Sequence, residues 1–478
     1  MKGKIRTGKE IGQTGKMLWG SFVEQMGRAI YGGIYDPGNP KADENGFRQD
    51  VLESVRRLKL PIVRYPGGNF VSGYDWKDGI GRNRPRRLNL AWSQIEPNTI
   101  GLHEFYHWAC LAGTEVMMAV NLGTASLRDA IELVEYTNFE GDTQWAGLRR
   151  SNGREKPFGF RYWCLGNEMD GEWQIGSLPA EDYACKAREV SKLIKVIDPK
   201  IRTTLVGSSA PDLPTYPAWE KTVLDIAYEQ VDYISLHRYY SYPERGGLRA
   251  YLEQDLDLIR YIETVSGIVQ ETKRRKNSAH DVRLALDEWN VWHRKGDSSA
   301  NRWQVSDVRV ENRYDFADAM LVAEMICAIA NHCDWVKIGC FAQLINVIGL
   351  IMTENGGRMY EQTSYYPFAF ASNFLNGKIV ESFVDGENAD RLRLTLCAHD
   401  GGFSLLAVNG DERESAQLSL KVPADSALSA QIMCAAPGEK NSFEEPKKVV
   451  PRAVEVLRRG EEAVVEMPPF SMLMLRCG

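Results

Sequence analysis

The sequence has little that would direct it to a membrane or to nucleic acid. Its first 18 residues contain five basic residues and no sustained apolar run, so we expect neither a signal peptide nor a transmembrane helix. Acidic and basic side chains are mixed along the 478 residues, with a net charge of -6 and no tail of one sign. This distribution gives no electrostatic reason for a nucleic-acid or membrane partner. We therefore expect a cytoplasmic protein without either partner.

Motifs of redox, nucleotide-binding and serine-hydrolase sites are also missing. The sequence has no CxxC pair, and no GxSxG, Walker A or GxGxxG motif stands between a predicted strand and helix. The cysteines are odd in number and lie mostly in apolar segments, so we expect reduced, buried thiols. They are Cys110, Cys164, Cys185, Cys327, Cys333, Cys340, Cys397, Cys434 and Cys477. Neither a cofactor nor a bound metal is indicated.

Short apolar runs separated by longer amphipathic stretches fill the first 345 residues. This alternation is typical of βα units and a parallel sheet. Between the first two runs, Phe47, Val51, Val55 and Leu58 recur at helical spacing, with polar residues opposite. Eight strands are predicted, at residues 17–22, 60–64, 116–120, 161–165, 202–207, 231–236, 283–287 and 335–341.

Eight strands alternating with helices favour a closed (β/α)8 TIM barrel of the α/β class. An open doubly wound sheet could also be written from this pattern. Polar residues stand just beyond the predicted strands, and in a barrel they would converge on one mouth. They are Glu24, Asn69, Asn121, Asn167 with Glu168, Ser208, His237 with Tyr239, Glu288 and Gln343.

Near residue 376 the pattern changes to short alternating strands with tight turns, as in "RLRLTLCA", "FSLLAVN" and "FSMLMLR". This pattern is typical of an antiparallel, jelly-roll-like β-sandwich of ~100 residues. A chain of this length exceeds one compact core, so we expect a catalytic barrel at residues 19–375 and the sandwich at 376–478. Residues 1–18 form an N-terminal segment that could join the sandwich.

Two glutamates follow short apolar runs, Glu168 in "WCLGNEMDGE" and Glu288 in "LALDEWNVW". They come after the fourth and seventh predicted strands, whose ends in an eight-stranded barrel lie roughly 14 Å apart. Inward-pointing side chains of ~4 Å leave the carboxyl groups on the order of 6 Å apart. Retaining glycosidases have separations of ~5–5.5 Å and inverting ones ~6.5–9.5 Å, so this distance indicates glycoside hydrolysis without fixing the stereochemistry.

Glycoside hydrolysis requires two carboxyl groups in different states. One donates a proton to the leaving oxygen, and the other, ionised, faces the anomeric carbon as positive charge develops there. On pattern alone, two glutamates that only form salt bridges explain the sequence equally well. Tryptophan favours the site, because sugar rings stack on aromatic surface. Six tryptophans lie near the proposed mouth: Trp76, Trp92, Trp163, Trp173, Trp289 and Trp292.

Nine stretches, in order across most of residues 19–375, resemble the α-L-arabinofuranosidases of glycoside hydrolase family 51. They are "GSFVEQMGRAIYGGIYDPGNP", "ADENGFRQDV", "RYPGGNFVSGYDWKDGIG", "RPRRLNLAW", "AVNLGT", "WCLGNEMDGEWQIG", "DYISLHRYY", "DEWNVW" and "AQLINVI". The resemblance implies the same barrel and sandwich. It also implies a retaining, exo-acting enzyme that removes terminal α-L-arabinofuranosyl residues from arabinoxylan, arabinan or derived oligosaccharides, and a homo-oligomer, often a hexamer.

By this resemblance Glu168 is the general acid/base, Glu288 is the nucleophile, and Asn167 bonds the sugar 2-hydroxyl. The remaining substrate-binding residues that it implies are Glu24, Asn69, Tyr239 and Gln343 in the furanose pocket, and Trp92, Trp173, His237 and Trp292 around it. Two positions depart from the family pattern and are expected to affect leaving-group subsites. Arg238 stands where an uncharged residue such as Gln is usual, and Gln25 where His is usual. The nearest alternative is an endo-glucanase or xylan-active enzyme on the same barrel.

Two further motifs suggest other functions. "HEFYH" at 103–107 is a literal HExxH, the zinc-hydrolase pattern. The apolar face of that helix, however, predicts His103 and His107 on the opposite, solvated side, away from the mouth. "GRNRPRR" at 81–87 has four arginines and could be a nucleic-acid patch. Its position between Trp76 and Trp92 favours a solvated lip of the sugar site.

Overall fold

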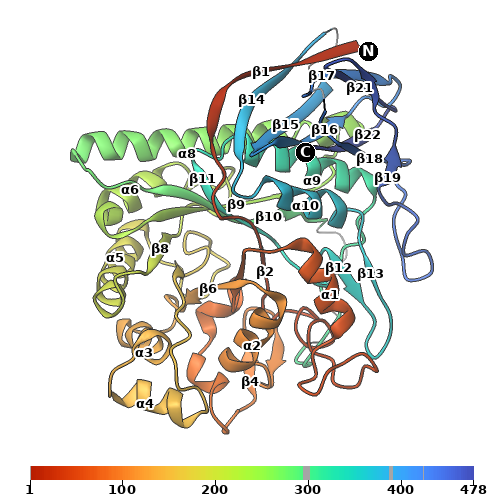
Figure 1. Ribbon diagram of the computed structural model, residues 1–478. Helices are drawn as coiled ribbons and strands as arrows, with labels where there is room; N and C mark the ends of the chain where they lie inside the picture. The colour runs from red at the N-terminus through yellow and green to blue at the C-terminus, as the bar shows by residue number, and fades with distance from the viewer. Residues whose placement is uncertain (1, 294–301, 387–390, 424) are drawn as a thin grey trace.

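A closed barrel of eight parallel strands forms the larger part of the protein (Figure 1). The computed structural model describes residues 2–293, 302–386, 391–423 and 425–478. Around the barrel the strands neighbour one another in the order β10-β11-β2-β3-β6-β7-β8-β9. They are β2 (Met17–Phe22), β3 (Ile62–Tyr65), β6 (Glu115–Val120), β7 (Tyr162–Leu165), β8 (Arg202–Leu205), β9 (Tyr233–Tyr240), β10 (Arg283–Val291) and β11 (Val336–Phe341).

These strands are the eight that the apolar runs predict, which confirms the barrel over the open sheet. Two strands are longer than predicted. β9 and β10 pair from Glu288 opposite His237 to Val291 opposite Tyr240, after a register shift that follows Ala285. Glu288, His237 and Tyr239 are therefore strand residues and do not lie beyond the strand ends. Backbone hydrogen bonds to neighbouring strands hold them more rigidly than a loop would.

Helices cover the outside of the barrel. They are α1 (Gln49–Leu58), α2 (Leu102–Ala112), α3 (Leu127–Asn138), α4 (Gln144–Ser151), α5 (Ala180–Ile197), α6 (Ala218–Ala227), α7 (Gly247–Leu252), α8 (Asp255–Lys276), α9 (Phe316–Ala330) and α10 (Tyr365–Ala371). In α1 the buried residues Val51, Val55 and Leu58 follow the predicted spacing. Phe47 is buried but precedes the helix, because Gly46 has a φ of 84° and Phe47 forms a β-bridge with Tyr35.

A ten-stranded sheet lies against one side of the barrel, at the top of Figure 1, and contains both chain ends. Its order is β19-β18-β22-β16-β15-β14-β1-β17-β21-β20. The strands are β1 (Lys2–Gln13), β14 (Lys378–Asp385), β15 (Leu392–His399), β16 (Gly402–Asn409), β17 (Ala416–Lys421), β18 (Leu428–Cys434), β19 (Arg452–Val454), β20 (Leu457–Arg459), β21 (Glu462–Met467) and β22 (Ser471–Cys477). The N-terminal strand β1 is antiparallel to β14 and parallel to β17, so it joins the two halves of the sheet.

Helix α9 connects the barrel to the sheet. It packs against β10 on one side and against β15, β16 and β22 on the other, and all fifteen of its residues are buried. A helix that is apolar on nearly every side is stable only when it is surrounded, and "FADAMLVAEMICAIA" is apolar except at Asp318 and Glu324. The sheet therefore supports the same strand, β10, that carries Glu288.

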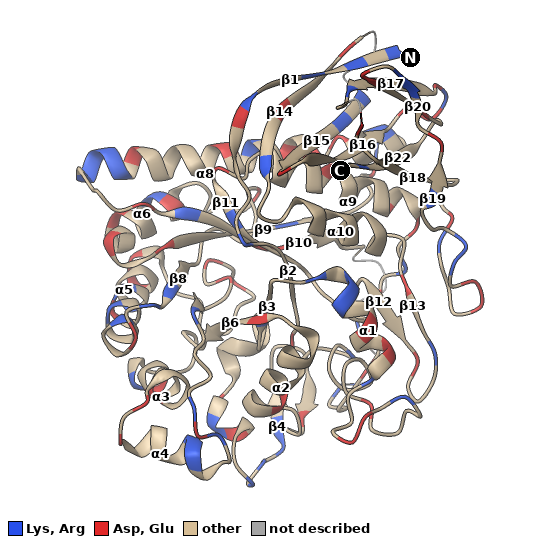
Figure 2. Cartoon of the chain, viewed as in Figure 1, with Lys and Arg blue, Asp and Glu red and all other residues tan. Residues whose placement is uncertain are grey.

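Charged residues of both signs are interspersed over the molecule (Figure 2). The most basic segment is the C-terminal end of α8, which holds Lys273, Arg274, Arg275 and Lys276. Positive side chains at this end complement the helix dipole, and several pair with Asp225 or Asp281. Within the described residues, no helix has both the length and the apolarity needed to cross a bilayer.

The role of β1 is tested by two neighbouring residues on its opposite faces. Ile5 is buried in the apolar core of the sheet, whereas Arg6 is exposed. We expect Ile5→Ala to lower the free energy of unfolding by about 2–4 kcal/mol through the cavity that it leaves. Arg6→Ala should change that free energy by no more than ~0.5 kcal/mol, because its ion pair with Asp385 is exposed. Urea unfolding of both variants measures this, and equal losses would contradict the assigned role of β1.

Candidate active site

A pocket of about 760 Å³ opens at the carboxyl ends of the barrel strands. Its lining includes nearly every residue that the resemblance assigns to the site: Glu24, Asn69, Trp92, Glu168, Trp173, Tyr239, Glu288, Trp292 and Gln343. The two others, Asn167 and His237, are buried directly behind this lining and contact its members. The structure thus brings all eleven together.

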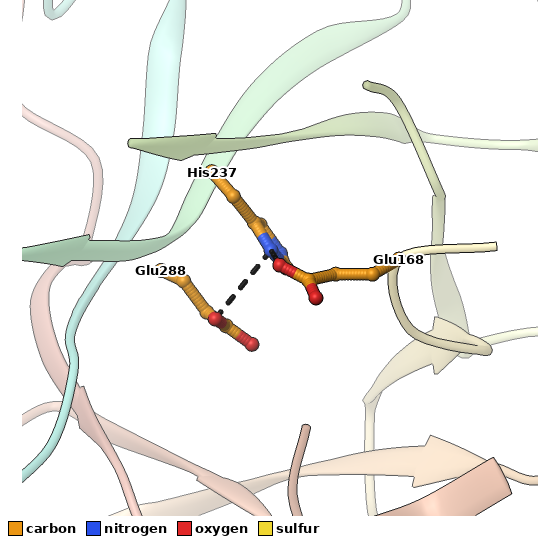
Figure 3. A group of neighbouring side chains, drawn as sticks. All are labelled: Glu168, His237 and Glu288. Atoms are coloured by element: carbon orange, nitrogen blue, oxygen red, sulfur yellow. Dashed lines mark hydrogen bonds and ion pairs between the residues drawn. The ribbon is translucent and has the colours of Figure 1, made fainter. Parts of the chain in front are cut away.

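Glu168 and Glu288 point toward each other across the pocket, with His237 beside them (Figure 3). One oxygen of each carboxylate and one nitrogen of His237 all lie within 4.8 Å of one another. Glu288 is buried, and the side chain of Glu168 is 12% exposed. The two carboxylates therefore face each other at close range, as the barrel geometry predicts.

Two donors hold the carboxylate of Glu288. Arg64 in β3 donates through Nη1 to Oε1 at 2.6 Å, and the Tyr239 hydroxyl donates to Oε2 at 2.7 Å. Burial raises the pKa of Tyr239 well above its usual range, so this hydroxyl keeps its proton and remains a donor. Charge-assisted hydrogen bonds from two sides fix the carboxylate in one orientation.

Sequence analysis missed Arg64 and Asp287, two buried residues that lie directly beside the pair of glutamates. Arg64 is 1% exposed, lies 3.4 Å from Asp287, and donates to Asn167 Oδ1 at 2.7 Å. The signal for Arg64 was present in the sequence. Side chains of a strand alternate between faces, and Ile62 lies in the barrel interior, so Arg64 two residues later had to point inward. A buried arginine requires an anion, and Glu288 and Asp287 are its anions.

His237 lies among three carboxylates. Its Nδ1 is 3.0 Å from Glu168 Oε1 and 3.5 Å from Glu288 Oε2, while Nε2 is 3.5 Å from Asp287 Oδ1. Burial favours the neutral ring, but the charges of Glu288 and Asp287 and the hydrogen bonds to Asp287 and Glu168 outweigh it and raise the pKa of His237 to about 10. The ring is therefore a cation at neutral pH that donates to Glu168.

The backbone around Glu168 is unusual for a non-glycine residue. Its φ is 44°, in the left-handed region, and Gly166, two residues earlier, has a φ of 90°. The segment is held in place by two side-chain contacts. Trp173 donates through Nε1 to Glu168 Oε2 at 2.7 Å, and Asp170 accepts the Ser209 backbone N–H at 3.0 Å. These contacts direct the Glu168 carboxylate into the pocket.

Glu24 lies among amide and indole donors on the wall formed after β2. Its Oε1 accepts from the Phe70 N–H at 2.8 Å and from Trp92 Nε1 at 2.7 Å, and Gln343 Nε2 donates to Oε2 at 3.3 Å. Burial raises the pKa of Glu24 to about 7, against the opposing effect of these hydrogen bonds. Asn167 donates to Asn69 Oδ1 at 3.0 Å nearby. This wall offers several hydrogen-bonding groups to a polyhydroxylated ligand.

Several predicted mouth residues lie elsewhere. Asn121 donates to Tyr74 O and Thr124, and Ser208 contacts Glu220 through its backbone N–H; neither lines the pocket. Three of the six tryptophans are also outside it. Trp76 packs between Tyr136 and Trp145, and both Trp163 and Trp289 are fully buried in the core. These predictions were wrong because position near a strand end does not fix the direction of a side chain.

Gln25 is buried away from the pocket as well. Its Nε2 donates to the Tyr65 hydroxyl, and its carbonyl accepts from Asn89 in β4 (Arg87–Asn89). The hydrogen bond to Asn89 therefore orients the short hairpin that β4 forms with β5 (Gln94–Glu96). Trp92 lies between these two strands. Arg84 and Arg87 of the arginine-rich segment pair with Glu104 and Asp78.

The HExxH residues do not form a site. His103 is half-buried and contacts the Tyr136 hydroxyl at 2.7 Å, whereas His107 is exposed. The prediction that both would lie on a solvated face was therefore wrong for His103, and burial lowers its pKa to about 4. Glu104 caps its own helix and pairs with Arg84. The three side chains that a zinc hydrolase would need at one site therefore do not converge on a common point.

Across the described part of the chain, the only His, Cys, Asp or Glu trio close enough to hold an ion is Glu168, His237 and Glu288. A protonated imidazole is no metal ligand, and the carboxylates around His237 keep its proton on. At neutral pH a metal ion would therefore have to displace a proton from His237 before it could bind all three side chains.

Comparison with known proteins agrees with this geometry. The profile of the "Alpha-L-arabinofuranosidase 1 domain" matches residues 54–245, and that of the "Alpha-L-arabinofuranosidase C-terminal domain" matches residues 287–471. An intracellular exo-α-(1→5)-L-arabinofuranosidase of Acetivibrio thermocellus is 46% identical over 384 residues, 79% of this chain and 76% of that one. The chain belongs to the family 51 α-L-arabinofuranosidases. It is thus a glycoside hydrolase, and the endo-glucanase alternative loses its support.

Solved structures of α-L-arabinofuranosidases share the whole architecture. A family 51 enzyme from Bifidobacterium longum superposes with a TM-score of 0.94 at 36% identity, covering 100% of this chain and 99% of that one. An arabinose complex of the Thermotoga maritima enzyme gives a TM-score of 0.88 at 32% identity, covering 99% of each chain. The predicted barrel with a C-terminal β-domain is therefore confirmed for this α-L-arabinofuranosidase.

Proton transfer without a metal is tested by chelation. We expect the α-L-arabinofuranosidase to keep its full activity after dialysis against EDTA, and His107→Ala to leave kcat/KM within about twofold, because His107 is exposed and distant from the pocket residues. Metal analysis of the purified protein provides the control. Stoichiometric zinc together with loss of activity on chelation would contradict this expectation.

Proposed function

We propose that this α-L-arabinofuranosidase is an exo-acting enzyme that removes terminal non-reducing arabinofuranosyl residues with retention of configuration. The supporting observation is the approach of the Glu168 and Glu288 carboxylates, whose nearest oxygens lie within 4.8 Å. An inverting enzyme needs ~6.5–9.5 Å to place a water between its carboxyl groups, whereas a retaining enzyme needs only ~5–5.5 Å. The pocket favours direct attack by one glutamate.

In the first step, Glu288 is the nucleophile and Glu168 the acid. A Glu288 oxygen forms a bond to the anomeric carbon while the bond to the leaving oxygen breaks, and Glu168 gives its proton to that oxygen. Arg64 and Tyr239 hold Glu288 in one orientation during attack. The products are the free leaving group, ionised Glu168 and a glycosyl ester on Glu288.

In the second step, Glu168 acts as the base. It removes a proton from water as the water oxygen attacks the anomeric carbon, and the ester bond to Glu288 breaks. His237 donates to Glu168 from the side, so it stabilises the ionised form that this step requires. Arg64 stabilises the negative charge that returns to the Glu288 carboxylate. Both glutamates end in their starting states.

The furanose ring is held by the polar wall and the aromatic residues. Asn167, which Arg64 and Asn69 hold directly behind the pocket lining, bonds the 2-hydroxyl in this proposal, and Glu24 with Gln343 bonds the more distant hydroxyls. Trp92 and Trp292 line the same part of the pocket, where an aromatic face can cover a sugar ring. Trp173 stands beside Glu168.

Relatives support the substrate class and the location. Besides the (1→5) enzyme, an exo-α-(1→6)-L-arabinofuranosidase of Bifidobacterium longum is 40% identical over 444 residues, 88% of this chain and 85% of that one. We propose arabinose-containing oligosaccharides or polysaccharides as substrates and, because several relatives are named intracellular, a cytoplasmic location. A homo-oligomer, in particular a hexamer, stays a prediction.

The roles of the two glutamates predict different effects of their removal. Glu288→Ala should lower kcat by at least ~10⁴-fold on every substrate, because no nucleophile remains. Glu168→Ala should lose ~10²–10⁴-fold on unactivated sugars but far less on dinitrophenyl arabinofuranoside, whose leaving group needs no proton. Steady-state kinetics on both substrates measure this. Azide should rescue Glu168→Ala as an arabinosyl azide. Equal losses on activated and unactivated substrates would exclude Glu168 as the acid.

The raised pKa of Glu24 predicts that substrate binding depends on pH. Its pKa is raised to about 7, so the carboxyl group is neutral below and charged above this pH. The charged form accepts hydrogen bonds from sugar hydroxyls more strongly, and we therefore expect KM to fall between pH 6 and pH 8. Glu24→Gln should raise KM and abolish this inflection. A KM profile that keeps the inflection in the variant would show that another group causes it.

A further inference from the structure

The pocket continues beyond the space of one sugar ring. Its volume of about 760 Å³ is on the scale of a drug-sized ligand, larger than a monosaccharide. The lining that is not assigned to the furanose includes the segment after β8 and the end of β9. These two segments contribute Ser209, Ala210, Asp212, Leu213, Arg238 and Tyr240.

This second part lies on the side of the acid/base. Asp170, two residues after Glu168, accepts hydrogen bonds from Ser209 and Thr215 in the segment after β8. The strands β7, β8 and β9 are neighbours in the barrel. Since Glu168 protonates the leaving oxygen, the leaving group must occupy this side of the pocket.

Arg238 is a fixed donor in the wall of this part. Nε and Nη2 each lie 2.8 Å from Asp257 Oδ2, and the guanidinium carbon is 4.8 Å from the centre of the Tyr240 ring. Its side chain is only 16% exposed, whereas Asp212, which accepts from Nη1 at 3.3 Å, is 74% exposed. Asp257 thus holds the Arg238 side chain in place from behind. Asp212 faces solvent, so a ligand can displace it from Arg238 or bind to both residues.

We propose that Arg238 and Asp212 form a leaving-group subsite that selects an uncharged sugar with neighbouring hydroxyl groups. One hydroxyl would accept from Arg238 Nη1, and the next would donate to Asp212. This inference rests on the proposed function and deepens it. Charge decides between neutral and acidic leaving groups. The exposed carboxylate of Asp212 lines this part of the pocket, so a carboxylate on the leaving group meets repulsion there.

The test compares two leaving groups in three variants. The substrates are a disaccharide of two α-linked arabinofuranose units and 4-nitrophenyl α-L-arabinofuranoside, which has no hydroxyls to bind. We expect Arg238→Gln to lower kcat/KM for the disaccharide ten- to fiftyfold, mostly through KM, and to change the aryl substrate by less than threefold. Asp212→Asn should act in the same direction by three- to tenfold. Arg202→Gln, at the opposite end of β8 and paired with Asp232, is the matched control and should alter neither value.

A second pair of substrates tests the charge. Asp212→Asn should improve turnover of a 4-carboxyphenyl arabinofuranoside relative to the neutral 4-(hydroxymethyl)phenyl compound by at least threefold. Equal losses of kcat/KM on the disaccharide and the aryl substrate in Arg238→Gln would overturn the proposal. An unchanged ratio of these two kcat/KM values in both variants would overturn it as well. If Arg238→Gln fails to fold, as judged by thermal melting, the Asp212→Asn variant decides alone. The deciding quantity is again kcat/KM for the disaccharide divided by kcat/KM for the aryl substrate. Failure of the wild type to cleave the aryl arabinofuranoside would instead refute the proposed function.

Discussion

The structure depends on keeping two carboxylates close together in a buried pocket. The nearest oxygens of the pair lie within 4.8 Å of each other, and two full negative charges about 5 Å apart repel each other by roughly 3–4 kcal/mol at an effective dielectric constant of 20. The site compensates with cations at shorter range. Arg64 touches Glu288 at 2.6 Å, and His237 lies 3.0 Å from Glu168. In the proposed mechanism, these two contacts let Glu288 stay ionised beside Glu168, which gains and loses a proton.

The fold supplies the rigidity that this arrangement needs. Arg64, His237, Tyr239 and Glu288 all belong to barrel strands, so backbone pairing sets their spacing. Only Glu168 stands on a turn, with a left-handed φ, and Trp173 and Asp170 fix that turn from two directions. Behind the barrel, α9 and the ten-stranded sheet cover β10. Rigid strands thus carry Glu288, the proposed nucleophile, and a turn fixed by these two contacts carries Glu168, the proposed acid/base.

Much of this arrangement could be predicted from the sequence. The eight apolar runs place the barrel strands to within a few residues, and the polar residues after them identify Glu168, Glu288, Glu24 and Gln343. Other features depend on contacts distant in sequence. Trp289 follows Glu288 directly and Trp163 precedes Glu168 by five residues, yet both tryptophans are buried in the core. The register shift after Ala285, which sets the direction of Glu288, has no local signal. Arg64 was predictable from the two-residue alternation of β3, but only once a buried anion had been assigned to it.

The most direct test of the paired carboxylates is the stereochemistry of a transfer product. With methanol added to the reaction, a glycosyl ester on Glu288 is opened by methanol from the face that the leaving group vacated. Proton NMR should then show methyl α-L-arabinofuranoside as the first transfer product. Formation of the β-anomer would mean a single displacement by a water or alcohol held between the glutamates, and would contradict the account.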